Sequence, residues 1–176
     1  MIVITKYIEE NEKRFKDDLE RIDKLRNSYS LYIAFLSFNA YMFDIIVKLV
    51  TISSFEYSVG KVLFIGATIF YLIFFLTSII CFLKLFRPER IEYLPLPKVI
   101  YVDYPDKLEK WAKSQGKDID LKKEVYDKYV EKLEQAVLNN SNYYKRKRGY
   151  ANDTIYFSLI TFPFLIMLIV LLKVSF

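Results

Sequence analysis

The chain of 176 residues contains no histidine, a single cysteine and only four glycines. Without histidine it lacks the commonest general base and the commonest zinc ligand, and no histidine-dependent catalytic triad can form. Because Cys81 is alone, an internal disulfide and a cysteine-based metal site are excluded. Neither GxGxxG nor GxxxxGKS/T occurs, so the two common phosphate-binding loops are absent. We therefore expect no cofactor and no metal.

Apolar residues make up 53% of the chain, and they gather in three blocks. Each block is long enough to cross a bilayer core of about 30 Å, and stretches rich in Lys, Glu and Asp separate them. This pattern predicts an all-α integral membrane protein with about three transmembrane helices and long cytoplasmic helices. The expected parts are a cytoplasmic helical arm over 1–29, transmembrane helices over 30–55, 62–86 and 154–176, and a cytoplasmic helical segment over 87–153. Pro163 inside the third span predicts a kink.

Basic residues flank the predicted spans mainly on one side. That side carries Lys24, Arg26, Lys84, Arg87, Arg90 and the run Lys145–Arg148, whereas the other side carries Lys61 and Lys173. By the positive-inside rule, the N-terminus and segment 87–153 lie in the cytoplasm. About 28 mostly polar residues precede the first long apolar run, so we expect no cleaved signal and a retained N-terminus.

The two cytoplasmic parts carry apolar residues at helical spacing. The stripes are Ile8, Phe15, Leu19, Ile22, Leu25, Tyr29 and Tyr32 in the arm, and Leu121, Val125, Tyr129, Leu133, Ala136, Asn140 and Tyr143 in the long segment. We expect the arm helix to run straight into the first span, the proline-rich loop 87–106 to be extended, and a short helix to end at Gly116. The two stripes predict an antiparallel or crossing helical pair. The helices bury each other within one subunit or bind neighbouring copies, and self-assembly is favoured because two helices alone bury little surface.

Polar residues form a strip along the first predicted span. Its members are Ser37, Tyr41, Asp44, Lys48 and Thr51, at steps of four, three, four and three. At about 100° per residue they stay on one narrow face of the helix. Charged residues at membrane depth usually face a bundle interior or a water-filled cavity, so the strip predicts the lining of a pore that a ring of subunits encloses. Two alternatives stay open: the strip packs against the other spans with Asp44 and Lys48 paired, or the span starts later and Lys48 reaches the interface.

A second candidate site is the sequence KRKRGYAND, Lys145 to Asp153. Four bases directly before a span are typical of an anchor for anionic lipid headgroups, and bases among tyrosines also suit contact with RNA. The stretch further resembles a divergent HEPN ribonuclease motif, in which an arginine is followed, after four to six residues, by histidine. Arg146 or Arg148 would be that arginine, and Asn152 with Asp153 stands at the histidine position. Because asparagine is no general acid–base, the resemblance implies a role in structure or RNA contact.

The whole layout has a polar helical arm, a two-span hairpin and a further cytoplasmic helix. It resembles small membrane effectors of bacterial anti-phage systems, and above all the membrane accessory protein encoded beside the RNA-guided ribonuclease of type VI-B CRISPR systems. The resemblance implies a non-enzymatic, self-assembling ring-shaped pore that compromises the inner membrane of infected bacteria. Its implied partners are further copies of the chain, membrane lipids, and the CRISPR ribonuclease or RNA.

Two functions of other classes stay open at the level of sequence. One is a membrane-tethered HEPN-like ribonuclease that uses Arg146 and Arg148. The other is a transmembrane effector gated by a cyclic oligonucleotide, with a pocket in the loop near Tyr101 and Tyr104. RNA cleavage by the purified protein supports the first, and binding of a cyclic oligonucleotide supports the second.

Overall fold

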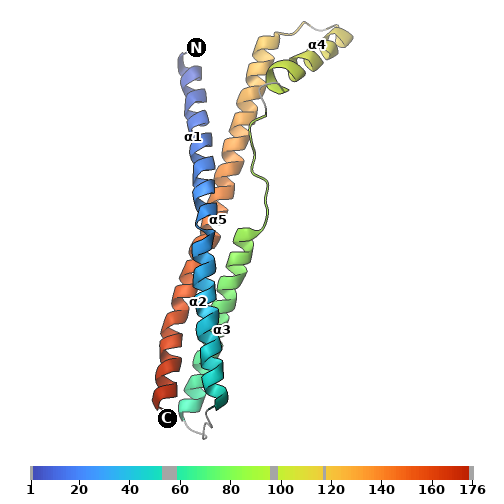
Figure 1. Cartoon of the computed structure of the whole chain (residues 1–176). Coiled ribbons are helices and arrows are strands. Elements are labelled where there is room, and N and C mark those ends of the chain that lie inside the picture. The colour runs from blue at the N-terminus through green and yellow to red at the C-terminus, as the bar shows by residue number, and fades with distance from the viewer. Residues whose placement is uncertain (1, 53–58, 96–98, 117, 175–176) are drawn as a thin grey trace. The chain divides into compact units, whose positions relative to one another are not determined.

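A computed structural model describes residues 2–52, 59–95, 99–116 and 118–174. Within these ranges every regular element is a helix, which confirms the all-α prediction (Figure 1). The elements are α1 (Ile2–Asn27), α2 (Tyr29–Ile52), α3 (Val59–Phe86), the π-helical turn η1 (Val99–Asp103), α4 (Tyr104–Gln115) and α5 (Leu121–Val174). In the described residues, three helical stretches are long and apolar enough to cross a membrane, in agreement with the three predicted spans. They are Lys6–Lys48, Gly60–Phe86 and Leu121–Lys173.

The chain divides into two compact units. The arm unit comprises Met1–Asp23 and Glu89–Lys145, and the span unit comprises Lys24–Pro88 and Arg146–Phe176. The helix α5 contributes its first part to the arm unit and its second part to the span unit. Each unit buries hydrophobic residues of its own.

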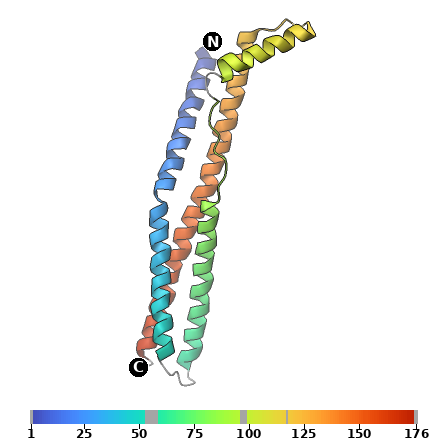
Figure 2. The same cartoon turned by 45° about the vertical axis from the view of Figure 1, so that its right-hand side comes forward.

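The span unit is a bundle of α2, α3 and the second part of α5, with α3 antiparallel to the other two (Figures 1 and 2). Its largest cluster joins Ile46 of α2, Phe64, Ala67 and Tyr71 of α3, and Leu165, Leu168 and Leu172 of α5. The outer faces are apolar as well, since Val62 and Leu76 remain 71% and 55% exposed. A helix that is apolar on all sides suits a lipid environment, so one face packs inside the bundle and the others are left for the bilayer.

The arm unit pairs α1 with the first part of α5. Phe15 packs on Leu133 and Ala136, and Ile8, Leu19, Leu94, Tyr129 and Val137 surround them. The Tyr7 hydroxyl donates to Glu134 (2.7 Å). The two helices therefore bury each other within one subunit. They run in the same direction, so the antiparallel alternative is wrong (Figure 2).

The arm helix was expected to run straight into the first span, but one residue, Ser28, separates α1 from α2. The Ser28 backbone N–H still donates to the carbonyls of Lys24 and Leu25, both at 3.2 Å. The Ser28 Oγ donates to the Leu25 carbonyl at 2.7 Å. A serine side chain that bonds to a carbonyl of the preceding turn competes with the helical ladder. The interruption is one residue long, since α1 ends at Asn27 and α2 begins at Tyr29.

The helix α5 runs for 54 residues without a break, so the boundary expected at residues 153 and 154 lies inside one helix. The basic run Lys145–Arg148 and Pro163 are both helical. A proline is tolerated in a transmembrane helix when neighbouring groups satisfy the backbone that it leaves unbonded. The kink expected at Pro163 stays a prediction.

The connection between α3 and α5 agrees with the sequence at both ends and differs in the middle. The span α3 ends at Phe86, just before Pro88. The helix α4 ends at Gln115 and is capped by Gly116, whose φ of 62° is the left-handed conformation that glycine adopts readily. Residues 88–95 are without helix or strand, as expected. The turn η1 and the start of α4 occupy residues 99–106 of the expected extended loop, because Pro105 lies in the first turn of α4, where proline is tolerated. Residues 96–98 of that loop lie outside the described residues.

Candidate functional site

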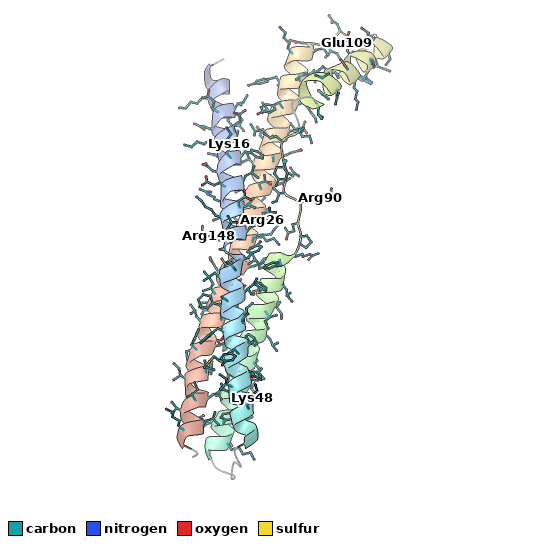
Figure 3. The ribbon with its side chains drawn as sticks, in the orientation of Figure 1. Lys16, Arg26, Lys48, Arg90, Glu109 and Arg148 are labelled. Atoms are coloured by element: carbon teal, nitrogen blue, oxygen red, sulfur yellow. The ribbon has the colours of Figure 1, made fainter. Side chains whose placement is uncertain are left out.

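The predicted strip lies on the outer face of α2. Ser37, Tyr41, Asp44 and Lys48 are all exposed, and Tyr41 is 63% exposed. Figure 3 shows Lys48 near the C-terminal end of α2. The side chain of Thr51 lies outside the described residues. The four described members thus share one helix face, as their spacing predicts, and that face is not buried in the span unit.

Asp44 and Lys48 form an ion pair along this face. The Lys48 Nζ donates to the Asp44 Oδ2 at 2.6 Å, while the two side chains stay 71% and 54% exposed. The acid precedes the base by one turn, which is the favourable order at this spacing. At 1.5 Å per residue α2 is about 36 Å long, and Asp44 lies about 5 Å from its midpoint. Asp44 is therefore placed where the hydrocarbon core is expected, whereas Lys48 lies about 11 Å from the midpoint, and the alternative in which it reaches the membrane interface stays open.

A different polar residue of α2 faces the interior of the bundle. Asn39 is fully buried, and its Oδ1 accepts a hydrogen bond from the Thr161 hydroxyl of α5 (2.5 Å). The backbone carbonyl of Asn39 accepts the Tyr71 hydroxyl of α3 (2.7 Å). The Asn39 Nδ2 donates to the Phe35 carbonyl within its own helix (3.0 Å). One residue thus links all three spans.

A second buried polar contact joins α3 to α5. The Ser78 hydroxyl donates to the Thr154 carbonyl at 2.8 Å and lies 2.7 Å from the Ser158 hydroxyl. All three side chains are buried. Polar contacts across helices are typical of packed transmembrane bundles. The spans are held together by these polar residues and by the apolar cluster, so the alternative in which the strip packs against the other spans does not match its four described members.

The basic run before the third span splits into two kinds of residue. Lys147 is fully buried, and its ammonium donates to the backbone carbonyls of Lys84 (2.9 Å) and Arg87 (2.7 Å) at the end of α3. A cation at these last carbonyls satisfies acceptors that the helix leaves unbonded and matches the negative end of its dipole. Arg146 and Arg148 are exposed (Figure 3 labels Arg148). The sequence pattern does not distinguish Lys147 from the other three bases of the run, so its capping role was not predicted.

The helix α5 does not gather the HEPN-like residues into one site. Arg146, Arg148, Asn152 and Asp153 are all exposed on it. At 100° per residue, Arg146 and Asn152 point about 120° apart, whereas Arg148 shares a face with Asn152, and Arg146 with Asp153. The four side chains therefore divide over two faces. Of the four, only Asp153 carries a group that can act as a general base, and it shares its face with Arg146 and not with Asn152.

A pocket in the arm unit lies next to Tyr104, but Tyr104 is the first residue of α4 and is not among the residues that line the pocket. The pocket has a volume of about 380 Å³ and lies between the start of α4 and the start of α5. Its lining consists of Pro105, Leu121, Lys122, Val125, Tyr126 and Tyr129. The side chain of Tyr101 lies outside the described residues. Among the described residues of the lining Lys122 is the only base, so this part of the pocket is a poor match for a ligand with several phosphates.

Comparisons with protein-family models, with curated proteins and with solved structures found no match to the chain. In the part of the chain that is described, no group of three or more acidic or cysteine side chains is placed to hold a metal ion. In the described residues, the strip on α2 and the basic residues near Lys147 are the candidate sites that the geometry carries furthest.

Proposed function

We propose that the chain assembles into a homo-oligomeric pore in the inner membrane of a bacterium, lined by Ser37, Tyr41, Asp44, Lys48 and Thr51. The observation that supports this most is the exposure of the Asp44–Lys48 pair on the face of α2 that is turned away from the other two spans. Asn39 on the opposite face serves the contacts within the subunit. The strip is thereby left for water or for another copy.

Free energies of insertion favour a hydrated strip over a strip in lipid. An aspartate or lysine at the centre of a transmembrane helix costs about 2.5–3.5 kcal/mol on translocon scales. The pairing of Asp44 with Lys48 offsets part of this cost, yet both side chains stay more than half exposed when paired. A ring of subunits replaces lipid by water along the strip, and three spans alone are too few to enclose such a path.

The orientation and the biological role of the proposed pore follow from the flanking charges and from the family resemblance. The excess of bases at Lys24, Arg26, Lys84, Arg87 and Lys145–Arg148 supports a cytoplasmic N-terminus. In this proposal the pore depolarises the membrane of an infected cell and so strengthens RNA-guided CRISPR defence. A plaque assay with and without the companion ribonuclease tests that role, because a pore of unrelated function gives no protection in either case.

The decisive experiment is the mass of the detergent-solubilised particle. A ring gives a mass several times that of the 21.0 kDa chain, and a monomer ends the pore proposal. Vesicles that contain a fluorescent dye then test permeability. We expect dye release from vesicles with the wild type and a changed release with Asp44→Ala or Lys48→Ala. Lys173→Ala, which removes an exposed lysine at the far end of α5, is the matched control and should leave the release unchanged.

The two alternatives have less support from the described geometry. For a membrane-tethered ribonuclease, the exposure of Arg146 and Arg148 is favourable, but the four HEPN-like residues divide over two faces of α5 and the chain has no histidine. For a cyclic-oligonucleotide-gated effector, the pocket beside Pro105 is favourable, but its lining is mainly apolar. RNA cleavage that is lost in Arg146→Ala, or tight binding of a cyclic oligonucleotide, would replace the pore proposal by one of these.

A further inference from the structure

All three helices of the span unit meet in a layer near Lys147. Tyr32 of α2, Leu85 of α3 and Ala151 of α5 are buried there. The half-buried residues packed against them are Leu25, Tyr29, Phe82, Tyr150 and Ile155. In this tyrosine-rich layer the junction of α1 with α2 lies beside both α3 and α5.

The end of α1, the end of α3 and the helix α5 each contribute two exposed bases within about one turn of the layer. They are Lys24 and Arg26 of α1, Lys84 and Arg87 at the end of α3, and Arg146 and Arg148 of α5. Figure 3 shows Arg26 and Arg148 at the same level. With Lys147, the stretches 24–32, 82–88 and 146–155 hold seven bases, and their only acid is Asp153. When the residues that border the stretches are included, Asp23, Glu89 and Lys145 are added, which gives eight bases and three acids. We call the six exposed bases the basic belt.

On one side of the basic belt the surface is apolar. In α5 this surface follows the bases in the sequence, and in α3, which is antiparallel, it precedes them. Leu83 is 62% exposed directly beside Lys84, and Leu159 is 49% exposed about three turns after Arg148. Tyrosines mark the level between the two kinds of surface. The Lys84 Nζ lies 5.8 Å from the centre of the Tyr150 ring, which keeps the lysine beside the ring that packs in the layer.

We propose that the basic belt binds the headgroups of anionic phospholipids, whose acyl chains then cover the apolar surface next to it. Phosphate is the partner that exposed arginines recognise best, and tyrosines are enriched where headgroups meet hydrocarbon. Each base near a membrane surface raises the affinity for anionic lipid by about fivefold. This proposal needs only the three spans and does not depend on the pore.

The geometry favours lipid over RNA. Binding of single-stranded RNA relies on aromatic faces on which bases can stack. Here Tyr32 is buried, and Tyr29 and Tyr150 pack in the layer. The belt also draws two bases from each of three helices instead of lining one groove. An apolar surface of exposed leucines beside the bases suits acyl chains and offers nothing to a nucleic acid.

Lipid retention by the full-length protein in detergent tests the proposal. The wild type is incubated with equal amounts of dioleoylphosphatidylglycerol and dioleoylphosphatidylcholine, and bound lipid is counted by native mass spectrometry. We expect the glycerol lipid to be preferred. Arg87→Gln combined with Arg148→Gln should lower this preference by about thirtyfold, from about fivefold per base. Lys107→Gln with Lys110→Gln on α4 removes the same charge from exposed positions and should leave the preference unchanged.

Three results would overturn the proposal. The first is equal retention of the two lipids by the wild type. The second is an equal loss in the α4 control, because net charge alone would then explain the effect. The third is an RNA oligonucleotide that displaces the anionic lipid and no longer binds the Arg87/Arg148 variant, since the belt would then be a nucleic-acid site. The preference is a ratio of two lipids bound in one sample, so a variant that folds poorly does not imitate a specific loss. A monomeric protein that prefers anionic lipid would contradict the pore proposal and leave the lipid proposal standing.

Discussion

Replacement of Lys147 by methionine tests the cap at the end of α3. The substitution keeps the apolar stem and removes the ammonium that donates to the carbonyls of Lys84 (2.9 Å) and Arg87 (2.7 Å). Two hydrogen bonds from a charged donor contribute about 3–6 kcal/mol together, but the burial of the ammonium costs several kcal/mol. The substitution removes both the favourable hydrogen bonds and the unfavourable burial of the ammonium. The stability that remains lost is the cost of leaving the two carbonyls without a donor. We expect the free energy of unfolding to fall by about 2 kcal/mol.

Unfolding of the full chain in mixed detergent micelles, followed by circular dichroism, measures this loss. Lys145→Met is the matched control, because it makes the same chemical change at an exposed position two residues away and should stay within about 0.5 kcal/mol of the wild type. Cys81, the only cysteine, lies half-buried on α3 and reports local opening. Its alkylation should accelerate in Lys147→Met and not in Lys145→Met. If both variants match the wild type in stability and in alkylation, the cap contributes nothing and the reasoning is refuted.

Three further predictions concern one contact, one titratable group and one glycine. A double-mutant cycle of Asn39→Ala and Thr161→Val should give a coupling free energy of about 0.6–1.7 kcal/mol in detergent unfolding, and a coupling of zero would contradict the 2.5 Å contact. Burial raises the pKa of Asp18 above its usual 3.8, so the folded state holds this proton to higher pH and loses stability as the pH rises through the raised pKa. Asp18→Asn should therefore melt at a higher temperature than the wild type at pH 7, the difference should vanish near pH 4, and a constant difference would refute the assignment. In Gly116→Ala the added methyl group meets no atom within 4 Å, but alanine is forced to a φ of 62°, which costs about 1–2 kcal/mol. Trp111 on α4, the only tryptophan, should report the loosened helix by a change in its fluorescence. An unchanged spectrum would argue against strain at this position.

Apolar runs located the spans because lipid selects length and composition, and both are local properties of a sequence. The structure has α2 at Tyr29–Ile52 and α3 at Val59–Phe86, against the predicted 30–55 and 62–86. The direction of the paired arm helices was missed, although the predicted topology contained it. Two helices that each lead into a span from the same side of the membrane have to run in the same direction. Side-chain stripes predict that helices pair, and connectivity decides how.

The cap formed by Lys147 shows a different limit of sequence reasoning. Four consecutive bases occupy four directions around a helix, since each residue turns by about 100°. One of them must therefore point toward whatever packs on that helix, and here it meets the end of α3. The sequence predicts that such a residue exists in the run. It does not predict which one, because the facing helix end lies about 60 residues earlier in the chain.

Two polar faces of α2 compete for the interior of the bundle, and local spacing does not decide between them. Asn39 lies about 200° around the helix from Ser37, so a bundle that buries one face exposes the other. The partners that hold Asn39 inside lie 32 and 122 residues away along the chain, at Tyr71 and Thr161. Because Asn39 serves contacts within the subunit, loss of Asn39 and loss of Asp44 should have separable effects. Asn39→Ala should lower the unfolding free energy of the isolated chain. Asp44→Ala should leave this free energy nearly unchanged and alter assembly or permeability. If Asp44→Ala destabilises the monomer as strongly as Asn39→Ala does, the strip lies inside the subunit and the pore loses its main support.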